Sequence, residues 1–301
     1  MSELRIIDLF AGIGGFHFAF DTPEINAKCV FASEWDAAAR RTYKHFFKSS
    51  SPWLFEEDEN GDTPRFAGDI TKVDPASIGD FDVLCGGFPC QPFSQAGLKK
   101  GMEEARGTLF FNILEILEAK RPAAYFLENV RGLASHKSGD RLTLDIIKSK
   151  LEGLGYSFGL YHVRASDFNV PQHRPRVFLI GFRDETAAQR FVPPSKQPLE
   201  KSLREIIPGV DRDIAFTLRV GGRGSGVHDR RNWDTYLVNG LPTRINKEQG
   251  LRIQGFPEGL EFPSGPEGVT EVQAMKQLGN SVAVPAIQAY AKAIHQALTA
   301  K

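Results

Sequence analysis

The pattern that most limits how this chain can fold is the alternation of strand-like and helix-like segments up to about residue 182. The strand-like segments are short runs rich in β-branched and aromatic residues: LRIIDLF (4–10), KCVFASE (28–34), FDVLCGG (81–87), AAYFLENV (123–130) and RVFLIGF (176–182). Helix-like segments lie between them at 36–47, 108–120 and 141–155. This alternation predicts an α/β fold with a mostly parallel sheet and helices on both of its faces.

The alternation ends in a proline-rich stretch, FVPPSKQPLEKS (191–202), which predicts a domain boundary. The next segment, to about residue 262, is rich in glycine and arginine and lacks the strand–helix rhythm, whereas helical periodicity returns from residue 270. We therefore predict a large domain formed by residues 1–185 and 265–301, and a small irregular domain formed by residues 186–264.

The cysteines and the N-terminus bear on where the protein works. Three cysteines in 301 residues form no disulfide framework, and their spacing fits no metal site, so we expect a reducing compartment and no metal. The start MSELRIIDLFAG does not resemble a signal peptide, and no apolar run approaches the roughly 20 residues of a membrane helix. These features predict a cytoplasmic protein that does not contact membranes.

A glycine-rich turn, DLFAGIGGF (8–16), follows the first predicted strand. Its G-x-G-G pattern differs from the G-x-G-x-x-G of dinucleotide-binding proteins, but glycines here let a ligand approach the backbone closely. Glu34 ends the second strand, where a carboxylate can accept hydrogen bonds from a ribose, and Trp35 offers a flat surface for adenine. Together they favour an adenosine-containing cofactor. Asp69 could accept from the adenine amino group, although alone it is better read as a turn cap.

Cys90 lies in a turn rather than in an apolar run. The stretch GGFPCQPFSQAG (86–97) follows a predicted parallel strand, and ligand sites of such sheets collect at the carboxyl ends of the strands. Pro89 and Pro92 stiffen the turn and direct the thiol, which could act as a nucleophile if its pKa is lowered. Cys85 lies inside the strand and is better explained as core packing.

Three charged residues lie where other strands meet the same edge. Glu128 ends the strand at 123–130, and its carboxyl group could share a proton with a ring nitrogen, or could be a surface acid. Arg174 and Arg176 precede or open the strand at 176–182 and could bind a phosphate or a pyrimidine carbonyl oxygen, or be solvated.

Taken in order, these stretches resemble the DNA (cytosine-5)-methyltransferase family of bacterial and phage restriction–modification systems. The matching stretches are DLFAGIGGF, EWD, GDI, GGFPCQPFS, GTLFF, ENV, QHRPRVFLIG, RIQGFP and QLGNSVAVP. The resemblance covers nearly the whole chain except about 190–245. It implies a Rossmann-like domain that binds S-adenosyl-L-methionine, a small target-recognition domain, and sequence-specific methylation of carbon 5 of cytosine in double-stranded DNA.

The resemblance also implies a mechanism. Cys90 attacks carbon 6 of a cytosine flipped out of the duplex, Glu128 holds ring N3 and the amino group, and Arg176, with Arg174, contacts the base carbonyl. Water is a plausible acceptor for the carbon 5 proton. The implied cofactor residues are Phe10, Gly12, Ile13, Gly14, Glu34, Trp35, Asp69, Ile70, Pro89, Leu109, Asn280, Ser281 and Val282.

The segment that reads the DNA sequence is predicted to be the small domain. Between residues 212 and 252 there are eight Lys or Arg against four acidic residues, a basic excess that the zero net charge of the chain conceals. The stretch FTL (216–218) resembles a family landmark, and arginine paired to guanine favours a GC-containing target. The predicted DNA-binding residues are Gln91, Ser94, Thr217, Arg219, Arg223, Arg230 and Arg231.

Three alternatives remain at the sequence level. They are a tRNA cytosine-5 methyltransferase, a DNA-binding relative that has lost catalysis, and a nicotinamide dehydrogenase, which the G-x-G-G turn and Cys90 disfavour. We further expect a monomer associated with the nucleoid through DNA, with a restriction endonuclease as a possible genetic partner.

Overall fold

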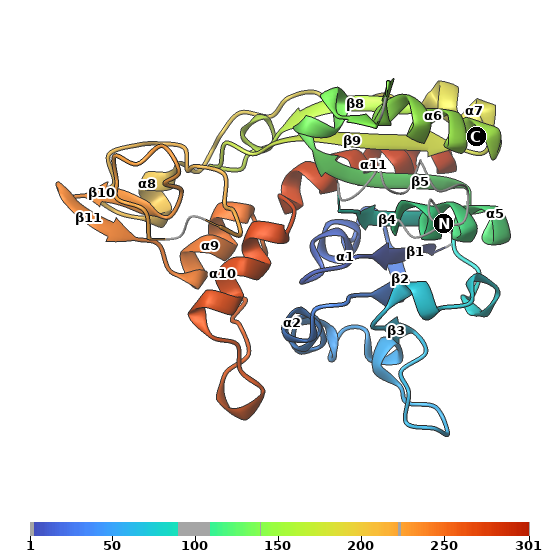
Figure 1. Cartoon of the computed structure of the whole chain (residues 1–301), viewed down its shortest axis with the longest axis horizontal. Coiled ribbons are helices and arrows are strands. Elements are labelled where there is room, and N and C mark those ends of the chain that lie inside the picture. Colours follow the sequence, from blue (N-terminus) through green and yellow to red (C-terminus); the bar gives the residue numbers. More distant parts are fainter. Residues whose placement is uncertain (1–2, 90–108, 139, 222–223, 301) are drawn as a thin grey trace.

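A seven-stranded sheet forms the centre of the large lobe in the computed structural model, which describes residues 3–89, 109–138, 140–221 and 224–300 (Figure 1). The strands are β1 (Leu4–Leu9), β2 (Ala27–Ser33), β3 (Phe66–Ala67), β4 (Val83–Gly87), β5 (Ala124–Val130), β8 (Gly159–Arg164) and β9 (Pro175–Phe182). Their order is β3-β2-β1-β4-β5-β9-β8, and only β9 runs against its neighbours. The predicted mostly parallel α/β sheet is confirmed, and so are the five predicted strands.

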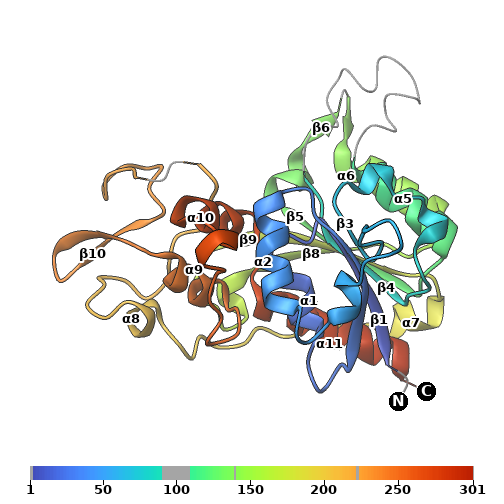
Figure 2. The ribbon, with the colours of Figure 1, turned by 90° about the horizontal axis from the view of Figure 1, so that it is seen from below.

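Helices cover both faces of this sheet, as predicted (Figures 1 and 2). The α-helices of the large lobe that the structure describes are α1 (Gly15–Phe20), α2 (Ala37–Phe47), α5 (Leu109–Lys120), α6 (Thr143–Gly153), α7 (Glu185–Arg190) and α11 (Val284–Thr299). Alternate residues of β1 face opposite sides, so Ile6 packs in the core with α1, α2 and α11, whereas Ile7 packs in the core with α5 and α6. Two apolar cores therefore hold the sheet between them.

A smaller lobe projects from the end of the sheet at which β9 begins (Figure 1). It contains α8 (Leu203–Ile206), the hairpin of β10 (Thr235–Val238) and β11 (Leu241–Arg244), and α9 (Lys247–Gln254). Helix α10 (Glu271–Asn280) packs on α9, and α11 then returns to pack on α1. The division at residues 186–264 stays a prediction, and α10 makes contacts across its second boundary.

Sequence patterns did not predict every element. Strand β8 was missed because most of its residues are only half buried or exposed, so it shows little apolar signal. A short hairpin of β6 (Lys137–Ser138) and β7 (Arg141–Leu142) was also missed. Within the described part of the chain, no helix combines the length and the apolar character that crossing a membrane requires.

A buried polar cluster lies beneath the glycine turn. The ring of His17 stacks on Phe47 at 3.8 Å, its Nδ1 lies 2.9 Å from the Tyr43 hydroxyl, and its Nε2 lies 3.4 Å from the Ser51 hydroxyl. Burial lowers the pKa of His17 to about 3, because the core cannot solvate the imidazolium. His17 is therefore neutral in the folded protein at physiological pH.

This buried histidine predicts a specific loss of stability in acid. The unfolded chain takes up a proton at His17 below pH about 6.5, whereas the folded chain does not do so until pH about 3. The contribution of His17 to the free energy of unfolding is thus complete above pH about 6.5. It falls by about 1.4 kcal/mol for each pH unit below that value. Urea unfolding at several pH values should show this component in the wild type and in the control His162→Gln, whose side chain is exposed. It should be missing in His17→Gln; equal slopes in both variants would contradict the prediction.

Candidate active site

A cavity of about 380 Å³ lies at the carboxyl ends of β1, β2, β4 and β5, where α10 faces the sheet. Ligand sites of open α/β sheets are found at this edge. The described residues that line it are Phe10, Gly12, Glu34, Trp35, Asp36, Ala39, Gly87, Phe88, Pro89, Leu109, Glu128, Asn129, Val130, Arg174, Arg176, Lys276, Gln277, Gly279 and Asn280. One cavity therefore joins several of the predicted cofactor residues to the predicted catalytic carboxylate and arginines.

The glycine turn holds its backbone in an unusual conformation beside this cavity. Phe10 and Gly12 have φ values of 56° and 57°, and Gly14 has a φ of 85°. At Gly14 a Cβ atom would lie 2.2 Å from the Phe47 ring, so both space and conformation require glycine there. This geometry turns the Gly12 N–H toward the second strand, where Glu34 accepts it at 2.7 Å.

Glu34 is held from two sides. Its Oε2 accepts the Gly12 N–H and its Oε1 accepts the Asp36 N–H, both at 2.7 Å. Burial raises the pKa of Glu34, and the two N–H donors oppose that shift. A carboxylate fixed in this way retains lone pairs for a second donor on each oxygen, which is what a ribose diol would supply. Trp35 follows on the cavity wall with 77% of its surface exposed. The site therefore fits an adenosine-containing group.

Glu34 gives rise to a test of cofactor binding. The resemblance implies that the cofactor is S-adenosylmethionine and that Glu34 binds its ribose, so replacing Glu34 with alanine should weaken the binding of this cofactor about ten- to a hundredfold through the loss of charge-assisted hydrogen bonds. Affinity for duplex DNA should change little. Calorimetric titrations with each ligand measure both effects, with Glu56→Ala as a matched control, since Glu56 is a surface acid paired with Arg65. Weaker DNA binding with unchanged cofactor binding would contradict the ribose assignment.

Helix α10 in the C-terminal segment forms the wall of the cavity that faces the sheet. Lys276 Nζ lies 2.9 Å from Asp36 Oδ2, and the Thr42 hydroxyl donates to Gln277 Oε1 at 2.9 Å. Both contacts join α10 to α2, and Asn280 lines the cavity while Ser281 and Val282 are buried beside it. Lys276 and Gln277 were not singled out from the sequence, because their partners lie more than 200 residues away in the chain.

Some predicted cofactor residues lie outside the cavity lining. Asp69 accepts the Thr71 N–H at 3.1 Å and the Thr71 hydroxyl at 2.7 Å, which is the turn cap considered from the sequence. Ile13 and Ile70 are buried in the two cores. Gly14 packs against Phe47 and Tyr43. Direct contact of these residues with a cofactor stays a prediction.

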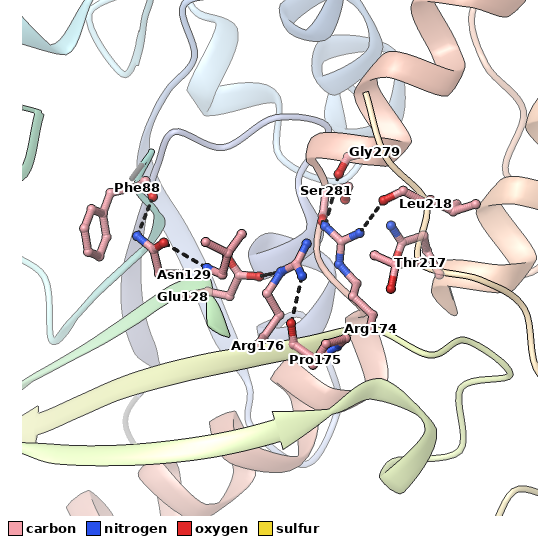
Figure 3. Close-up of polar contacts among 12 residues, drawn as sticks. Phe88, Glu128, Asn129, Arg174, Pro175, Arg176, Thr217, Leu218, Gly279 and Ser281 are labelled. Carbon is pink, nitrogen blue, oxygen red and sulfur yellow. Dashed lines mark hydrogen bonds and ion pairs between the residues drawn. The ribbon is translucent and has the colours of Figure 1, made fainter. Parts of the chain in front are cut away.

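Glu128 and Arg176 form an ion pair at the end of β5 (Figure 3). The Nε of Arg176 lies 2.7 Å from Oε1 of Glu128, and only 14% and 10% of the two side chains are exposed. The pair forms because β9 lies next to β5 with Val130 opposite Arg176. Arg176 Nη1 also donates to the Pro175 carbonyl at 2.8 Å. The structure thus brings together two of the residues predicted to hold a base.

Asn129 links this pair to the cysteine loop. Its Nδ2 donates to the Phe88 carbonyl at 2.9 Å, and its Oδ1 accepts the Val130 N–H at 2.8 Å. Asn129 was not predicted as a site residue, although it stands in the ENV motif. The end of β5 is therefore tied to the backbone that leads through Pro89 to Cys90. Cys90, Gln91 and Ser94 lie outside the described residues.

Arg174 is buried and binds backbone carbonyls of two distant segments (Figure 3). Its Nη1 donates to the Leu218 carbonyl at 3.1 Å, and its Nη2 donates to the carbonyls of Gly279, at 3.2 Å, and Ser281. Burial, reinforced by the nearby charge of Arg176, lowers the pKa of Arg174. Both terminal nitrogens of Arg174 donate to these carbonyls, and these hydrogen bonds connect the two lobes. Contact of Arg174 with a base stays a prediction.

Two buried glutamines complete this junction between the lobes. Gln172 accepts the Leu218 N–H at 3.1 Å and donates to the Ile253 carbonyl at 3.2 Å and to Gln254 Oε1 at 3.0 Å. Gln254 in turn donates to the Leu278 carbonyl at 2.7 Å. At Gly279 a Cβ atom would lie 2.5 Å from the carbonyl carbon of Arg219. The segments around Gly279 and Arg219 can therefore approach this closely only because residue 279 is glycine. Gln172, Arg174 and Gln254 are hereafter called the lobe junction.

Thr217, Arg219, Arg230 and Arg231, the predicted DNA-binding residues that the structure describes, follow the lobe-junction residues Gln172 and Arg174 in the chain. The Thr217 hydroxyl donates to the His173 carbonyl, and Arg219, Arg230 and Arg231 are exposed. Arg231 pairs with Asp229 at 2.7 Å. Arg223 lies outside the described residues. Contact of these residues with DNA stays a prediction.

Comparisons with known proteins agree on one family. A model of that family, described as C-5 cytosine-specific DNA methylase, matches residues 4–217 and 219–296. The chain is 37% identical to the type II methyltransferase M.NlaX of Neisseria lactamica, with 98% of this chain and 97% of the relative covered. It is 32% identical to M.HhaI of Haemophilus parahaemolyticus, covering 100% of this chain and 97% of that relative.

Solved structures show the same fold. The S. pombe Dnmt2 methyltransferase superposes with a TM-score of 0.72 at 20% identity, covering 98% of this chain and 99% of that one. A putative DNA modification methyltransferase encoded within an E. coli prophage gives a TM-score of 0.68 at 18% identity, covering 98% and 99%. These superpositions show that the chain shares its overall fold with both proteins.

Proposed function

The chain belongs to the C-5 cytosine-specific DNA methylase family and is a DNA (cytosine-5)-methyltransferase of the restriction–modification type, and from this premise we propose how its residues act. We propose that it methylates cytosine within one specific sequence of double-stranded DNA. The observation that carries the proposal is the buried pair of Glu128 and Arg176, in one cavity with Glu34 and with the Pro89 end of the cysteine loop.

The target cytosine must leave the duplex before it can react. Carbon 6 lies inside the base stack, so extruding the nucleotide costs a few kcal/mol and exposes the face that the thiolate attacks. We propose that Cys90 then forms a bond from Sγ to carbon 6, and that the electron pair displaced toward carbon 5 makes that carbon nucleophilic. After carbon 5 has been methylated, water accepts its proton, and the electron pair of the broken C–H bond expels the Cys90 thiolate and restores the aromatic ring.

Glu128 and Arg176 would hold the base during this sequence. A carboxyl group can bind the amino group of cytosine and share a proton with N3, which offsets the negative charge that develops when the thiolate adds. The guanidinium of Arg176 would bind the carbonyl oxygen of the base, and its ion pair with Glu128 fixes both groups at one separation. Arg174 would position the site indirectly, by holding the backbone at Leu218 and Gly279 in place.

S-adenosylmethionine is the methyl donor that methyltransferases of this family generally use, and when bound it supplies an electrophilic methyl group. Its adenosine would be held by Glu34 through the ribose and by Trp35 through the adenine ring, with the Gly12 turn, Leu109 and Asn280 around them. The other residues implied by resemblance would support this wall from the core.

The substrate and partners that we propose follow from the family and from the exposed arginines of the smaller lobe. DNA is what enzymes of this type act on, and the exposed arginines beyond the lobe junction, Arg219 and Arg230, would contact it. We propose a monomer, because one chain carries the cavity, both lobes and the predicted recognition residues. A restriction endonuclease of the same specificity would be its genetic partner.

Transfer of labelled methyl groups tests the proposed function. Purified enzyme, labelled S-adenosylmethionine and either mixed-sequence duplex DNA or tRNA should give label in DNA at carbon 5 of cytosine. Bisulfite sequencing of DNA from expressing cells would then identify the methylated sequence. Activity on tRNA alone would overturn the proposal.

A further inference from the structure

A second cavity, of about 290 Å³, opens next to the active site and is lined by basic residues. Its lining is Arg131, His162, Val163, Arg164, Asp167, Pro175, Arg176 and Lys196. Arg176 lines both cavities, so the two lie on either side of the arginine that pairs with Glu128. The second cavity is called the basic pocket below.

The sheet register explains why cations gather here. Val130 of β5 and Val163 of β8 both lie opposite Arg176 of β9, so the three residues form a row across three strands. Arg131 and Arg164 are the next residues after the two valines and therefore flank the start of β9 on both sides. In the order of the sheet, the basic pocket spans the row from the end of β5 through β9 to β8, so Arg164 lies beyond β9 from the cofactor residues of β1 and β2, whereas Arg131 follows β5.

The charge of the basic pocket is not balanced. Arg131 and Arg164 are exposed, and no ion pair or side-chain hydrogen bond joins either guanidinium to another residue that the structure describes. Asp167 is the one acidic residue of the described lining, and it forms an ion pair with Lys196, with 3.0 Å between Asp167 Oδ2 and Lys196 Nζ. Arg176 is likewise occupied by Glu128. Two free guanidinium groups thus remain beside the place where a flipped base would be held.

We propose that the basic pocket binds the DNA backbone at the phosphates that flank the flipped cytosine, with Arg131 and Arg164 as the phosphate contacts. This inference rests on the proposed function. A nucleotide that swings out of the duplex rotates about its own backbone, so its flanking phosphates stay next to the pair that holds the base. Each carries one negative charge, which a planar guanidinium can bind with two parallel hydrogen bonds. Because the guanidinium groups of Arg131 and Arg164 are exposed to solvent, the basic pocket is expected to bind an anion and not an apolar ligand.

The test compares how binding of a duplex that contains the methylated sequence depends on salt. In Arg131→Gln/Arg164→Gln the dissociation constant should rise about tenfold for each arginine, the effect of one lost charge-assisted contact. The slope of log K against log salt should become shallower by about 0.9 for each phosphate contact removed. KM for DNA should rise while KM for S-adenosylmethionine does not, and the set of methylated sequences should not change.

Two further variants make the result specific. Arg183→Gln/Arg190→Gln removes the same charge from exposed residues near the opposite end of β9, and it should keep the wild-type slope. Arg131→Lys/Arg164→Lys keeps the charge and should retain most of the slope. The inference is overturned if the glutamine variant at the basic pocket matches the control, or if it loses affinity for tRNA but not for DNA. A wild-type enzyme that binds the duplex but transfers no methyl group would instead refute the proposed function, since the salt slopes are measured without turnover.

Discussion

Cys90→Ser is expected to reduce kcat for DNA methylation by at least about a thousandfold, while the fold and the binding of S-adenosylmethionine are kept. A thiol at neutral pH is partly ionised and strongly nucleophilic, whereas a serine hydroxyl needs an adjacent base to become so. Glu128 is paired with Arg176 and would be needed at the ring nitrogen of the base, so we do not expect it to serve as the base that activates serine. Single-turnover methyl transfer to duplex DNA measures the loss.

A covalent trap separates this mechanism from simple damage to the site. Duplex DNA carrying 5-fluorocytosine should form a stable adduct with the wild type, because carbon 5 then has no proton to lose and Cys90 cannot be expelled. Cys90→Ser should form none. Cys85→Ala is the matched control: Cys85 is buried in β4, so its loss should cost some stability but leave the adduct intact. Unchanged turnover in Cys90→Ser would remove this residue from the mechanism.

Glu128→Gln is expected to lower kcat by about a hundred- to ten-thousandfold and also to destabilise the protein. Glutamine can still donate to a base, but it cannot share a proton with N3. The substitution also leaves the partly buried Arg176 without its carboxylate, which lowers the free energy of unfolding by up to about 3–5 kcal/mol. Methyl transfer and urea unfolding of the same preparation measure the two effects.

The two effects can be separated in a double variant. In Glu128→Gln/Arg176→Gln no buried charge is left unpaired, so much of the lost stability should return while activity stays lost. Glu152→Gln is the control, because Glu152 forms an exposed ion pair with Lys148 that should contribute little to stability. If the double variant recovered activity together with stability, Glu128 would be a structural residue and not a catalytic one.

The positions of the site residues at strand ends could be predicted from the sequence, because a strand end is marked locally by the end of an apolar run. Glu34 follows the run KCVFAS and Glu128 lies near the end of AAYFLENV, and parallel strands bring such ends to one edge. The predicted meeting of Glu128 and Arg176 needed one further condition, that the strand at 176–182 lies beside the one at 123–130. The sheet meets that condition with an antiparallel pair.

The role of Arg174 could not be predicted in the same way. Its partners are carbonyls at Leu218, Gly279 and Ser281, which lie 44, 105 and 107 residues further along the chain. Backbone carbonyls have no sequence signature, so an arginine two residues before Arg176 looks like a second base contact. The basic pocket escaped notice for a related reason, since Arg131 and Arg164 become neighbours only through β9.

The lobe junction bears on how such an enzyme could acquire a new target sequence. Gln172 and Arg174 hold the predicted recognition segment by the N–H and the C=O of Leu218, which every residue at that position except proline would offer. The attachment is therefore largely indifferent to the side chains that follow it. Mutation could rewrite those side chains, or recombination could exchange the segment, while the catalytic edge keeps its alignment. This chain would then be a suitable host for grafted recognition segments, provided that the graft keeps the path of the backbone at Leu218.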